Sequence, residues 1–414
     1  MTPEVVSEIL PSQKGMFDLV VFDEGSQIYV EKAIPTILRG QKVLVAGDNK
    51  QLRPSSLGVG RIEYDDETEE EEQFGSEAAL EEESLLDLAC AKYDQTMLDY
   101  HYRSKYEELI AFSNYAFYRG RLRVSPNFEK PITPPIEVIK VPNGIWVKRT
   151  NHQEAVQVLR LLKQFLDRRQ KQETVGIITF NSAQRDLIED LIDEECRKSP
   201  KFATIYKKEL ERRSAEGEDL GIFIKNIENV QGDERDTIIF SFAYAKNESG
   251  RVVRNFGWLN QEGGENRLNV AVTRAKLKIY IVTSVKSSEL RVEDLKNRGP
   301  KILKKYLQYA EAISDGKSNE AQRILHSLND APSEEDTLTF DSEFEIQVYD
   351  ELVARNFKVE TQVGIGGYRI DLAIKNHDQT KYLLGIECDG KLYHSSKTAR
   401  ERDIHRQAYL ESRG

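Results

Sequence analysis

The sequence predicts an α/β protein built on parallel sheets, with a smaller α/β domain near its end. Five strand-like runs each lead into a polar turn, and such continuous apolar runs indicate strands buried on both faces. Helical patterns stand between the runs, at Ala183–Glu195 and Leu268–Lys276, which is typical of parallel α/β units. The runs read "FDLVVFDEGS", "QKVLVAGDNK", "TVGIITFNS", "DTIIFSFAY" and "KIYIVTS".

The first two runs end in residues suited to nucleotide chemistry. Asp23 and Glu24 close the first run, and Asp48 and Gln51 follow the second. Ligands of parallel sheets bind beyond the carboxyl ends of the strands, where these side chains are expected. In triphosphate hydrolysis one carboxylate holds Mg²⁺, its neighbour orients or deprotonates the attacking water, and a nearby amide can sense the terminal phosphate.

Composition narrows the class of protein. The chain has 414 residues and a net charge of −11, but Glu63–Glu83 holds twelve acidic residues and no basic one, which leaves +1 for the rest. This run is interpreted as a solvated loop, and a near-neutral body can still carry basic grooves for nucleic acid. No apolar run reaches membrane-spanning length and the three cysteines lie far apart, so we expect a cytoplasmic protein with no membrane partner and no disulfides.

Further motifs follow in a fixed order after the Asp-Glu pair. They are "AGDNKQLRP", "LDYHYRS", "NVQGDERD" and "RLNVAVTRAK", with "GIITFNSAQRDLI" between the second and the third. Together they resemble motifs II to VI, and an additional nucleic-acid-contact motif, of superfamily 1 helicases of the nonsense-mediated-decay type, over roughly Phe17–Ser284. The resemblance implies two RecA-like lobes that use ATP with Mg²⁺ and bind nucleic acid.

The resemblance also implies roles for single residues. Asp23 would hold Mg²⁺, Glu24 would be the catalytic base and Gln51 would sense the phosphate, with Asp48 beside it. Arg103 and Arg274 would be arginine fingers. The remaining nucleotide contacts would be Gly232, Glu234 and Arg267, although Arg267 has a structural salt bridge as its alternative. Thr179, Asn181 and Gln184 would bind strand phosphates, with capping of the next helix as the alternative.

No phosphate-binding loop, G-x-x-x-x-G-K-[ST], stands before Asp23. The only "GKS", Gly316–Ser318, lacks the first glycine and lies in a helical stretch. The first lobe is therefore expected to be incomplete, and the chain to be the C-terminal piece of a larger protein that does not turn over ATP by itself. An upstream polypeptide would supply the loop. We expect first-lobe residues at 1–94 with an acidic insertion at 63–83, the second lobe at 95–286, a helical linker at 287–335 and a last domain at 336–414.

The last domain carries its own acidic pattern. Asp371 lies in one predicted strand, and Glu387 and Asp389 end the strand after a short turn. Carboxylates gathered on a hairpin can hold Mg²⁺ or Mn²⁺ for phosphodiester hydrolysis, although acids facing solvent are the alternative. The segments "GGYRIDLAI" and "LLGIECDGKLYHSSKTARERD" resemble restriction-endonuclease-like domains related to very-short-patch-repair enzymes, with Glu345 as the helical acid. Lys391 and His394 are both candidates for activating water, and three arginines that could touch phosphates are Arg400, Arg402 and Arg406.

The sequence therefore favours a fragment of an ATP-dependent helicase coupled to a metal-dependent DNA endonuclease, for DNA processing or defence against foreign DNA. DNA is preferred over RNA only by analogy with similar fusions. Two alternatives stay open at this point: an RNA helicase with an inert tail, and a non-catalytic nucleic-acid-binding or assembly module.

Overall fold

The computed structural model describes residues 1–54, 84–124, 131–168, 173–252, 254–328, 343–363, 370–376, 378, 382–386 and 388. The chain divides into two units, Met1–Leu98 and Asp99–Gly414, and each is described by itself. The acidic stretch at 63–83 lies outside the described residues. None of the helices that are described is both long and apolar enough to cross a membrane.

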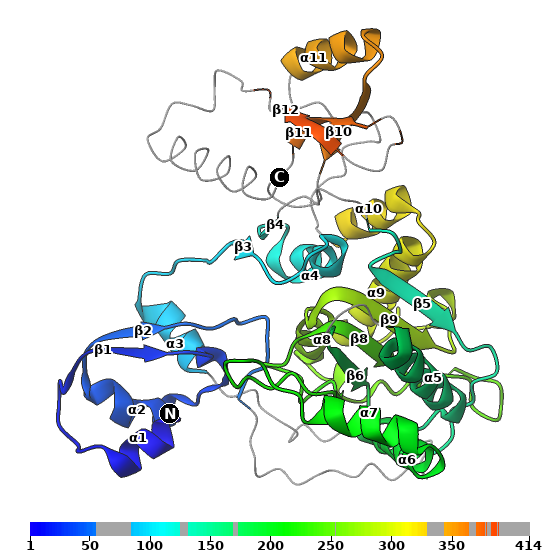
Figure 1. Cartoon of the computed structure of the whole chain (residues 1–414). Coiled ribbons are helices and arrows are strands. Elements are labelled where there is room, and N and C mark those ends of the chain that lie inside the picture. Colours follow the sequence, from blue (N-terminus) through cyan, green and yellow to red (C-terminus); the bar gives the residue numbers. More distant parts are fainter. Residues whose placement is uncertain are drawn as a thin grey trace. The chain divides into compact units, whose positions relative to one another are not determined.

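The first unit is a small α/β layer (Figure 1). Its elements are α1 (Pro3–Ile9), β1 (Phe17–Phe22), η1 (Gly25–Gln27), α2 (Val30–Leu38), β2 (Gly40–Val45) and α3 (Leu85–Lys92). Strands β1 and β2 are parallel, and Phe22 pairs with Val45. Phe22, Ala33 of α2 and Leu85 of α3 form its buried core. The helix between two parallel strands is the crossover that such a pair requires.

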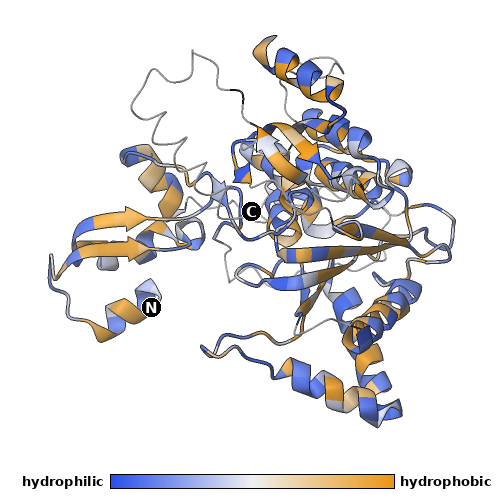
Figure 2. Ribbon diagram, turned by 45° about the horizontal axis from the view of Figure 1, so that its top comes forward, coloured by the Kyte–Doolittle hydropathy of each residue, from blue (hydrophilic) through white to orange (hydrophobic). Residues whose placement is uncertain are grey.

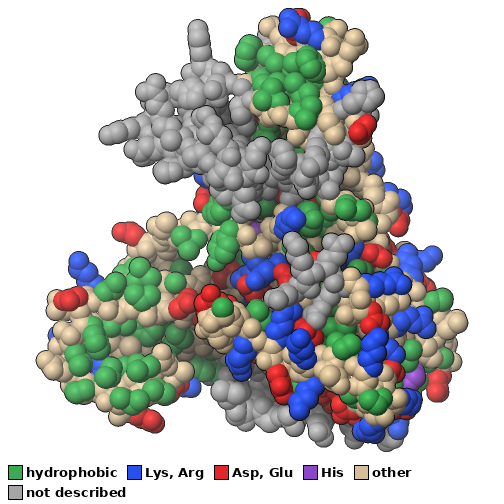
Figure 3. Space-filling model, in the orientation of Figure 1, with side chains coloured by type: hydrophobic (Ala, Val, Ile, Leu, Met, Phe, Trp, Pro, Cys, Tyr) green, Lys and Arg blue, Asp and Glu red, His purple; other side chains and the backbone are tan. Residues whose placement is uncertain are grey.

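The opposite face of this sheet is open in the described residues. Leu19, Val21 and Leu44 are 51%, 57% and 50% exposed. Figures 2 and 3 show hydrophobic residues along both strands and at the surface there. The prediction that these two strands are buried on both faces is wrong for this chain, because the described helices α2 and α3 pack with Val20, Phe22 and Val45 and cover one face only.

The second unit contains a five-stranded parallel sheet in the order β5-β9-β8-β6-β7. The strands are β5 (Ile136–Lys140), β6 (Val175–Thr179), β7 (Phe223–Asn226), β8 (Arg235–Ser241) and β9 (Ala275–Thr283). All five predicted runs form strands, at β1, β2, β6, β8 and β9. The edge strands β5 and β7 were not predicted, because each has only four or five residues and no long apolar run.

Helices cover both faces of this sheet (Figure 1). On one face α5 (His152–Arg168) and α6 (Ser182–Lys198) pack against Ile177, Ile239 and Val282, and α7 (Pro200–Leu210) adds Phe202. Ile178 and Phe240, one position further along their strands, point to the other face and are also buried. The helices on that side are α4 (Glu108–Tyr118), α8 (Gly264–Val272) and α9 (Arg298–Ser314). The helix predicted at 268–276 ends at Val272, because Ala275 already pairs with Arg235 in the sheet.

The stretch expected as a linker, 287–335, contains η3 (Ser287–Glu289), α9 and α10 (Ser318–His326). Helix α9 buries Leu303, Tyr306 and Leu307, and it packs on β5 and α8. The lysines on the outer side of α9 make the sequence of this stretch look polar, although one side of the helix is apolar. In the structure these helices therefore form part of the core of the second unit, in addition to connecting it with the last described segment. The segment "GKS", Gly316–Ser318, lies where α9 ends and α10 begins, so it is in a helical stretch as predicted.

The last described segment forms α11 (Glu343–Ala354) and an antiparallel sheet of β10 (Lys358–Val363), β11 (Ile370–Lys375) and β12 (Tyr382–Ile386). Leu372 pairs with Ile386, so the predicted hairpin of two strands is present. Strand β10 was not predicted, although Val359, Thr361 and Val363 alternate with polar residues as in a half-buried strand.

Candidate functional site

The first unit brings two strand ends together at the predicted magnesium corner. The Gly25 amide donates to the Ala46 carbonyl at 2.8 Å, and the Ala46 amide donates to the Phe22 carbonyl at 2.8 Å. A Cβ on Gly25 would lie 2.5 Å from Val45 Cγ1, so only glycine permits this approach. Asp23 and Glu24 therefore leave β1 beside the loop that carries Asp48 and Gln51, as predicted.

The backbone at this corner is bent into an uncommon conformation. Glu24 has φ +53°, in the left-handed region, and its amide donates to Asp23 Oδ1 at 2.9 Å. Gln27 Nε2 donates to Glu24 Oε2 at 3.3 Å. Such strain is found at functional sites more often than elsewhere. Both acids are exposed, so their oxygens can be reached from solvent.

Asp48 and Gln51 are already linked to one another. Asp48 Oδ2 accepts from Gln51 Nε2 at 2.9 Å, and Asp48 Oδ1 accepts from the Lys50 amide at 2.8 Å. The described residues contain no group of three acids, histidines or cysteines able to hold a metal ion by itself. The exposed carboxylates of Asp23 and Glu24 are nevertheless suitable ligands for Mg²⁺. This ion usually binds one or two carboxylates and completes its coordination with water and substrate phosphate.

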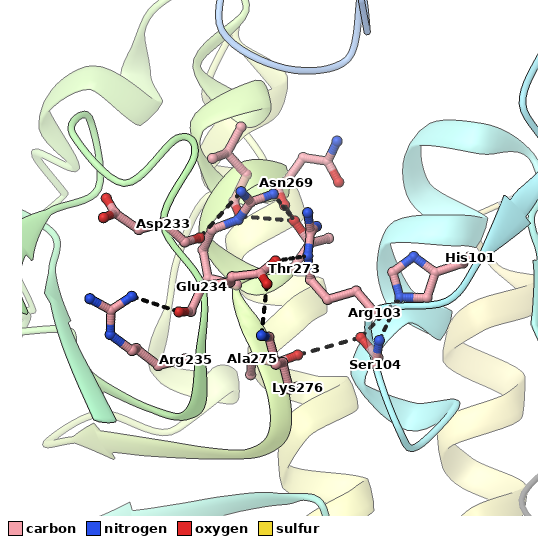
Figure 4. A network of polar contacts seen from close by, with 12 residues as sticks. His101, Arg103, Ser104, Asp233, Glu234, Arg235, Asn269, Thr273, Ala275 and Lys276 are labelled. Carbon is pink, nitrogen blue, oxygen red and sulfur yellow. Dashed lines mark hydrogen bonds and ion pairs between the residues drawn. The ribbon is translucent and has the colours of Figure 1, made fainter. Parts of the chain in front are cut away.

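A second polar cluster lies in the second unit, at the amino ends of β8 and β9 (Figure 4). Arg103 Nε donates to Glu234 Oε2 at 2.6 Å, and Lys276 Nζ lies 2.7 Å from Glu234 Oε1. Burial by itself would raise the pKa of Glu234, but hydrogen bonds from Lys276 and Arg103, and their positive charges, outweigh burial and hold this pKa below its usual value. Glu234 is therefore a carboxylate at neutral pH.

The two predicted arginine fingers differ in how they are held. Only Nε of Arg103 is bonded among the described residues, and its side chain is 31% exposed, so its terminal nitrogens face no protein acceptor there. Arg274 is 3% exposed. It donates from Nε to the Val270 carbonyl at 2.8 Å and from Nη2 to Thr273 Oγ1 at 2.9 Å. These bonds fix the Arg274 guanidinium at the end of α8.

His101 and Ser104 support the segment that carries Arg103. The Ser104 amide donates to His101 Nε2 at 3.1 Å, and Ser104 Oγ donates to the Ala275 carbonyl at 3.4 Å. Burial, followed by the nearby charges of Arg103 and Arg274, lowers the pKa of His101 to about 4. The ring is therefore neutral at pH 7 and carries its proton on Nδ1, since Nε2 accepts.

Two further predicted nucleotide contacts are Gly232, which directly precedes Asp233, and Arg267, which lies on α8. Gly232 has φ +83°, and no atom lies within 4 Å of the place that a Cβ would take, so it is needed for its backbone conformation rather than for lack of space. Arg267 lies over the Trp258 ring, 4.8 Å from its centroid. Burial raises the pKa of Glu228, and the charge of Arg267 acts against this rise. These contacts hold Arg267 within the unit but do not decide between a structural salt bridge and a nucleotide contact, so both stay predictions.

The predicted phosphate-binding residues sit at the start of α6. Asn181 Oδ1 accepts from the Gln184 amide at 2.8 Å, so Asn181 caps this helix. Gln184 and Thr179 are fully buried: Gln184 bonds both backbone groups of Asn151, and Thr179 Oγ1 donates to the Asn181 carbonyl. Asn181 Nδ2 has no hydrogen-bond partner in the described part of the chain. This nitrogen is itself buried, so the structure gives it no access for a ligand, and the strand-phosphate role of the three residues stays a prediction.

The acids of the last domain are described in part. Asp371 lies near the start of β11, and its Oδ2 accepts from the Cys388 amide, just beyond β12, at 2.7 Å. Glu345 lies on α11 and is 3% exposed, and α11 packs against β10 and β11. The other predicted residues of this domain lie outside the described residues: Glu387, Asp389, Lys391, His394, Arg400, Arg402 and Arg406.

Sequence reasoning missed two members of the second cluster. Lys276 holds the other oxygen of Glu234, and His101 holds Ser104. Both stand inside motifs quoted above, "TRAK" and "DYHYRS", so the signal was their position next to the arginines.

Known proteins give an independent comparison. Residues 81–286 match a family described as an AAA domain, and residues 344–414 match the family REase_MTES_1575. The chain is 36% identical over 417 positions to "Uncharacterized ATP-dependent helicase MG140 homolog" of Mycoplasma pneumoniae, and 35% identical to "Uncharacterized ATP-dependent helicase MG140" of Mycoplasma genitalium; each alignment covers 100% of this chain and 36% of the relative.

A third relative is more distant. It is "Uncharacterized ATP-dependent helicase MJ0104" of Methanocaldococcus jannaschii, 27% identical over 282 positions, covering 67% of this chain and 37% of that protein. The chain thus spans little more than a third of the length of these relatives. The predicted fold class, RecA-like α/β with a small further domain, agrees with the parallel sheet and with both family matches. These similarities support a superfamily 1 helicase, joined in the same chain to a domain that fits the restriction-endonuclease-like type.

Proposed function

We propose that the intact protein is an ATP-driven nucleic-acid translocase that carries a metal-dependent DNA endonuclease at its C-terminal side. It would act in the cytoplasm, in DNA processing or in defence against foreign DNA. The observation that supports the motor best is the cluster around Glu234, where Arg103 and Lys276 hold the carboxylate and Arg274 contacts the Asp233 carbonyl beside it. Phosphoryl transfer is catalysed mainly by positive charge placed around the transferring group.

The residues divide the work of ATP hydrolysis between them. Asp23 would hold Mg²⁺, which neutralises charge on the phosphates, and Glu24 would take the proton of the attacking water. Gln51, held by Asp48, would contact the terminal phosphate. Arg103 would use its terminal nitrogens for bidentate contact, while Arg274 supplies charge from a fixed position. Gly232 and Glu234 would contact the rest of the nucleotide.

The phosphate-binding loop would come from an upstream polypeptide of the same protein. This proposal agrees with the share of the relatives that the chain spans. Glu345, Asp371, Glu387 and Asp389 would hold Mg²⁺ or Mn²⁺ in the nuclease, whose kinship to very-short-patch-repair enzymes is part of the proposal. The contact of Asp371 with the Cys388 amide supports it, because Cys388 stands between Glu387 and Asp389 in the chain.

The motor is tested by ATP turnover of the full-length protein with and without single-stranded DNA or RNA. We expect strand-stimulated turnover that Glu24→Gln reduces by on the order of 10³-fold, because the water loses its base. Glu31→Gln, on the exposed face of the first unit, serves as the control for loss of one acid. Turnover that Glu24→Gln leaves intact would contradict the assigned base, and stimulation by RNA alone would favour an RNA helicase.

The nuclease is tested on single- and double-stranded DNA and RNA with Mg²⁺ or Mn²⁺. Asp371→Ala should abolish cutting, whereas Glu351→Gln, on the exposed side of α11, should not. Full-length protein that neither cuts nor binds metal under these conditions would make the last domain a binding module or an inert tail. Cutting of RNA alone would overturn the choice of DNA while the chemistry stands.

A further inference from the structure

A short hairpin just before α5 carries an unusual turn. The Val147 amide donates to the Thr150 carbonyl at 3.0 Å, and the Thr150 amide donates back to the Val147 carbonyl at 2.9 Å. The two residues between them, Lys148 and Arg149, have φ +47° and +64°. Two consecutive positive φ values define the tight turn that normally takes Asn-Gly. Here two long cationic side chains occupy it instead.

The side chains of this turn are available to a ligand. Neither Lys148 nor Arg149 has a hydrogen bond or an ion pair among the described residues. Arg149 interacts electrostatically with Glu228: burial raises the pKa of Glu228, and the charges of Arg267 and Arg149 act against this rise. Ile145 and Val147, on either side of Trp146, are 46% and 42% exposed. The tip is thus cationic and its flanks are apolar.

The base of the hairpin is bonded to the rest of the unit. The Trp146 amide donates to the Lys246 carbonyl at 3.0 Å, just beyond β8, and the Trp146 ring stacks on Tyr244 with centroids 5.7 Å apart. Tyr244 is buried, and burial raises its pKa. Asn151, the residue after the turn, exchanges two hydrogen bonds with Gln184. These contacts hold the turn in its strained backbone conformation. Conformational strain of this kind is found most often at functional sites.

The hairpin lies beside the start of α6. Tyr244 contacts both Trp146 and Phe180, with the Phe180 centroid 5.9 Å away, and Phe180 directly precedes Asn181. The cationic turn and Asn181 therefore belong to one edge of the sheet as described, where β6 and β8 end. The Glu234 cluster lies at the other end of β8, so the two sites use opposite edges.

We propose that the hairpin Ile145–Thr150 is a contact for a single-stranded nucleic acid. Lys148 and Arg149 would pair with successive phosphates, and the half-buried Trp146 would offer its ring to a base. Aromatic faces and cations together are the usual means of holding a strand without reading its sequence. This inference rests on the proposed function, since it requires that the chain binds a strand.

The chain offers a variant that removes the charges without harming the turn. Lys148→Asn with Arg149→Gly introduces the dipeptide that this turn prefers. Binding of fluorescent dT20 and rU20 is measured by anisotropy between 50 and 300 mM salt. For the polymer that the unmodified chain binds more tightly, we expect affinity to fall by about tenfold and the salt slope to fall by about 1.4, which is about 0.7 for each lost phosphate contact on a single strand.

The matched control is Lys207→Gln with Lys208→Gln, which removes the same charge from the exposed side of α7. A second readout uses tryptophan fluorescence, because the chain has only two tryptophans. In Trp258→Phe, the remaining Trp146 should be quenched when the oligonucleotide saturates the protein.

The outcomes separate the two proposals. If the hairpin variant keeps the affinity and the salt slope, or only shares the loss of the α7 control, the hairpin is not a strand contact although the proposed function stands. Unchanged Trp146 fluorescence at saturation overturns the role of its ring. If the unmodified chain binds neither polymer, this inference fails; if the full-length protein also binds neither, the proposed function fails with it.

Discussion

Arg103 and Arg274 share one cluster, but their surroundings give them different tasks. Arg103 has free terminal nitrogens in the described part of the unit and a single ion pair, with Glu234. Arg274 is almost completely buried and bonds the Val270 carbonyl and Thr273 Oγ1. A side chain that fills backbone acceptors contributes to stability as well as to chemistry.

Removal of each arginine should therefore have a different signature. In the full-length protein, Arg103→Ala should lower kcat by on the order of 10³-fold with little change in KM, because the charge acts on the transition state. Arg274→Ala should also destabilise the second unit by about 1–3 kcal/mol, since buried acceptors lose their donor. Steady-state kinetics and urea unfolding distinguish the two. Equal losses in kcat and in nucleotide binding for Arg103→Ala would make it a ground-state ligand instead.

Glu154 is a buried acid outside the Glu234 cluster. Its Oε2 accepts from the Ala243 amide at 2.7 Å and its Oε1 from Asn151 Nδ2 at 3.0 Å. Burial raises its pKa from 4.5 to about 7, and hydrogen bonds from Ser284 and Ala243 act against that rise. Because the folded state holds its proton more tightly than the unfolded state, this acid favours folding below pH 4.5, and that contribution is lost as the pH rises through 7.

The second unit should consequently lose up to about 3 kcal/mol between pH 5 and pH 8 from this residue. In Glu154→Gln the side chain cannot ionise, so this part of the pH dependence should disappear, although the variant is less stable at low pH. Urea unfolding followed by tryptophan fluorescence reports the second unit, which contains both tryptophans. The same slope in Glu154→Gln and in the unmodified chain would assign the pH dependence to other groups.

At the scale of elements, the contact between the ends of β1 and β2 positions the proposed magnesium ligands. A Cβ on Gly25 would lie 2.5 Å from Val45 Cγ1 and 3.1 Å from the Ala46 carbonyl. The two loops can thus approach only because Gly25 has no side chain. The carboxylates of Asp23 and Glu24 depend on this approach for their place beside Asp48.

Gly25→Ala should separate the two strand ends and destabilise the first unit by about 1–3 kcal/mol, as overpacking does. Hydrogen exchange should rise at the Gly25 and Ala46 amides, which bridge the strands. The double variant Gly25→Ala with Val45→Ala removes the clashing methyl group and should recover part of the protection. No recovery would show that the carbonyl contact, rather than the Val45 side chain, sets the cost.

At the scale of the whole molecule, the residues proposed to be catalytic lie in two separate units. Asp23 and Glu24 lie in the first, and Arg103 and Arg274 lie in the second. The sequence of this chain supplies no G-x-x-x-x-G-K-[ST] loop for the phosphates. Nucleotide binding by a motor depends on the backbone amides and the lysine of that loop.

This chain alone should therefore show no strand-stimulated ATP turnover, while the full-length protein does. Purified chain is measured with saturating dT20 or rU20, and the Glu24→Gln variant is measured in parallel to identify contaminating ATPases. Turnover that is substantial in the chain and absent in Glu24→Gln would show that phosphate is held without such a loop.

The sequence by itself determined the central parallel strands, the order of the motifs around them and the hairpin of β11 and β12. These features are local. A strand of about five to nine residues and the polar turn after it are consecutive in the sequence, so their pattern can be recognised there. The place of Asp23, Glu24, Asp48 and Gln51 just beyond two neighbouring strands could be predicted for this reason, while their roles stay predictions. Short edges such as β5 and β7 carry too few residues for the pattern to stand out.

Only the tertiary structure decided which side chains are available to act. Arg103 meets Glu234 across 131 positions of sequence, and no local pattern reports that contact. Gln184 and Thr179 are fully buried and make their hydrogen bonds inside the unit, which no local pattern reports. The cationic turn at Lys148 and Arg149 contradicts its own local preference. Such a turn is set by packing on Tyr244 and by the bonds of Asn151, because long-range contacts can outweigh the conformational preference of two residues.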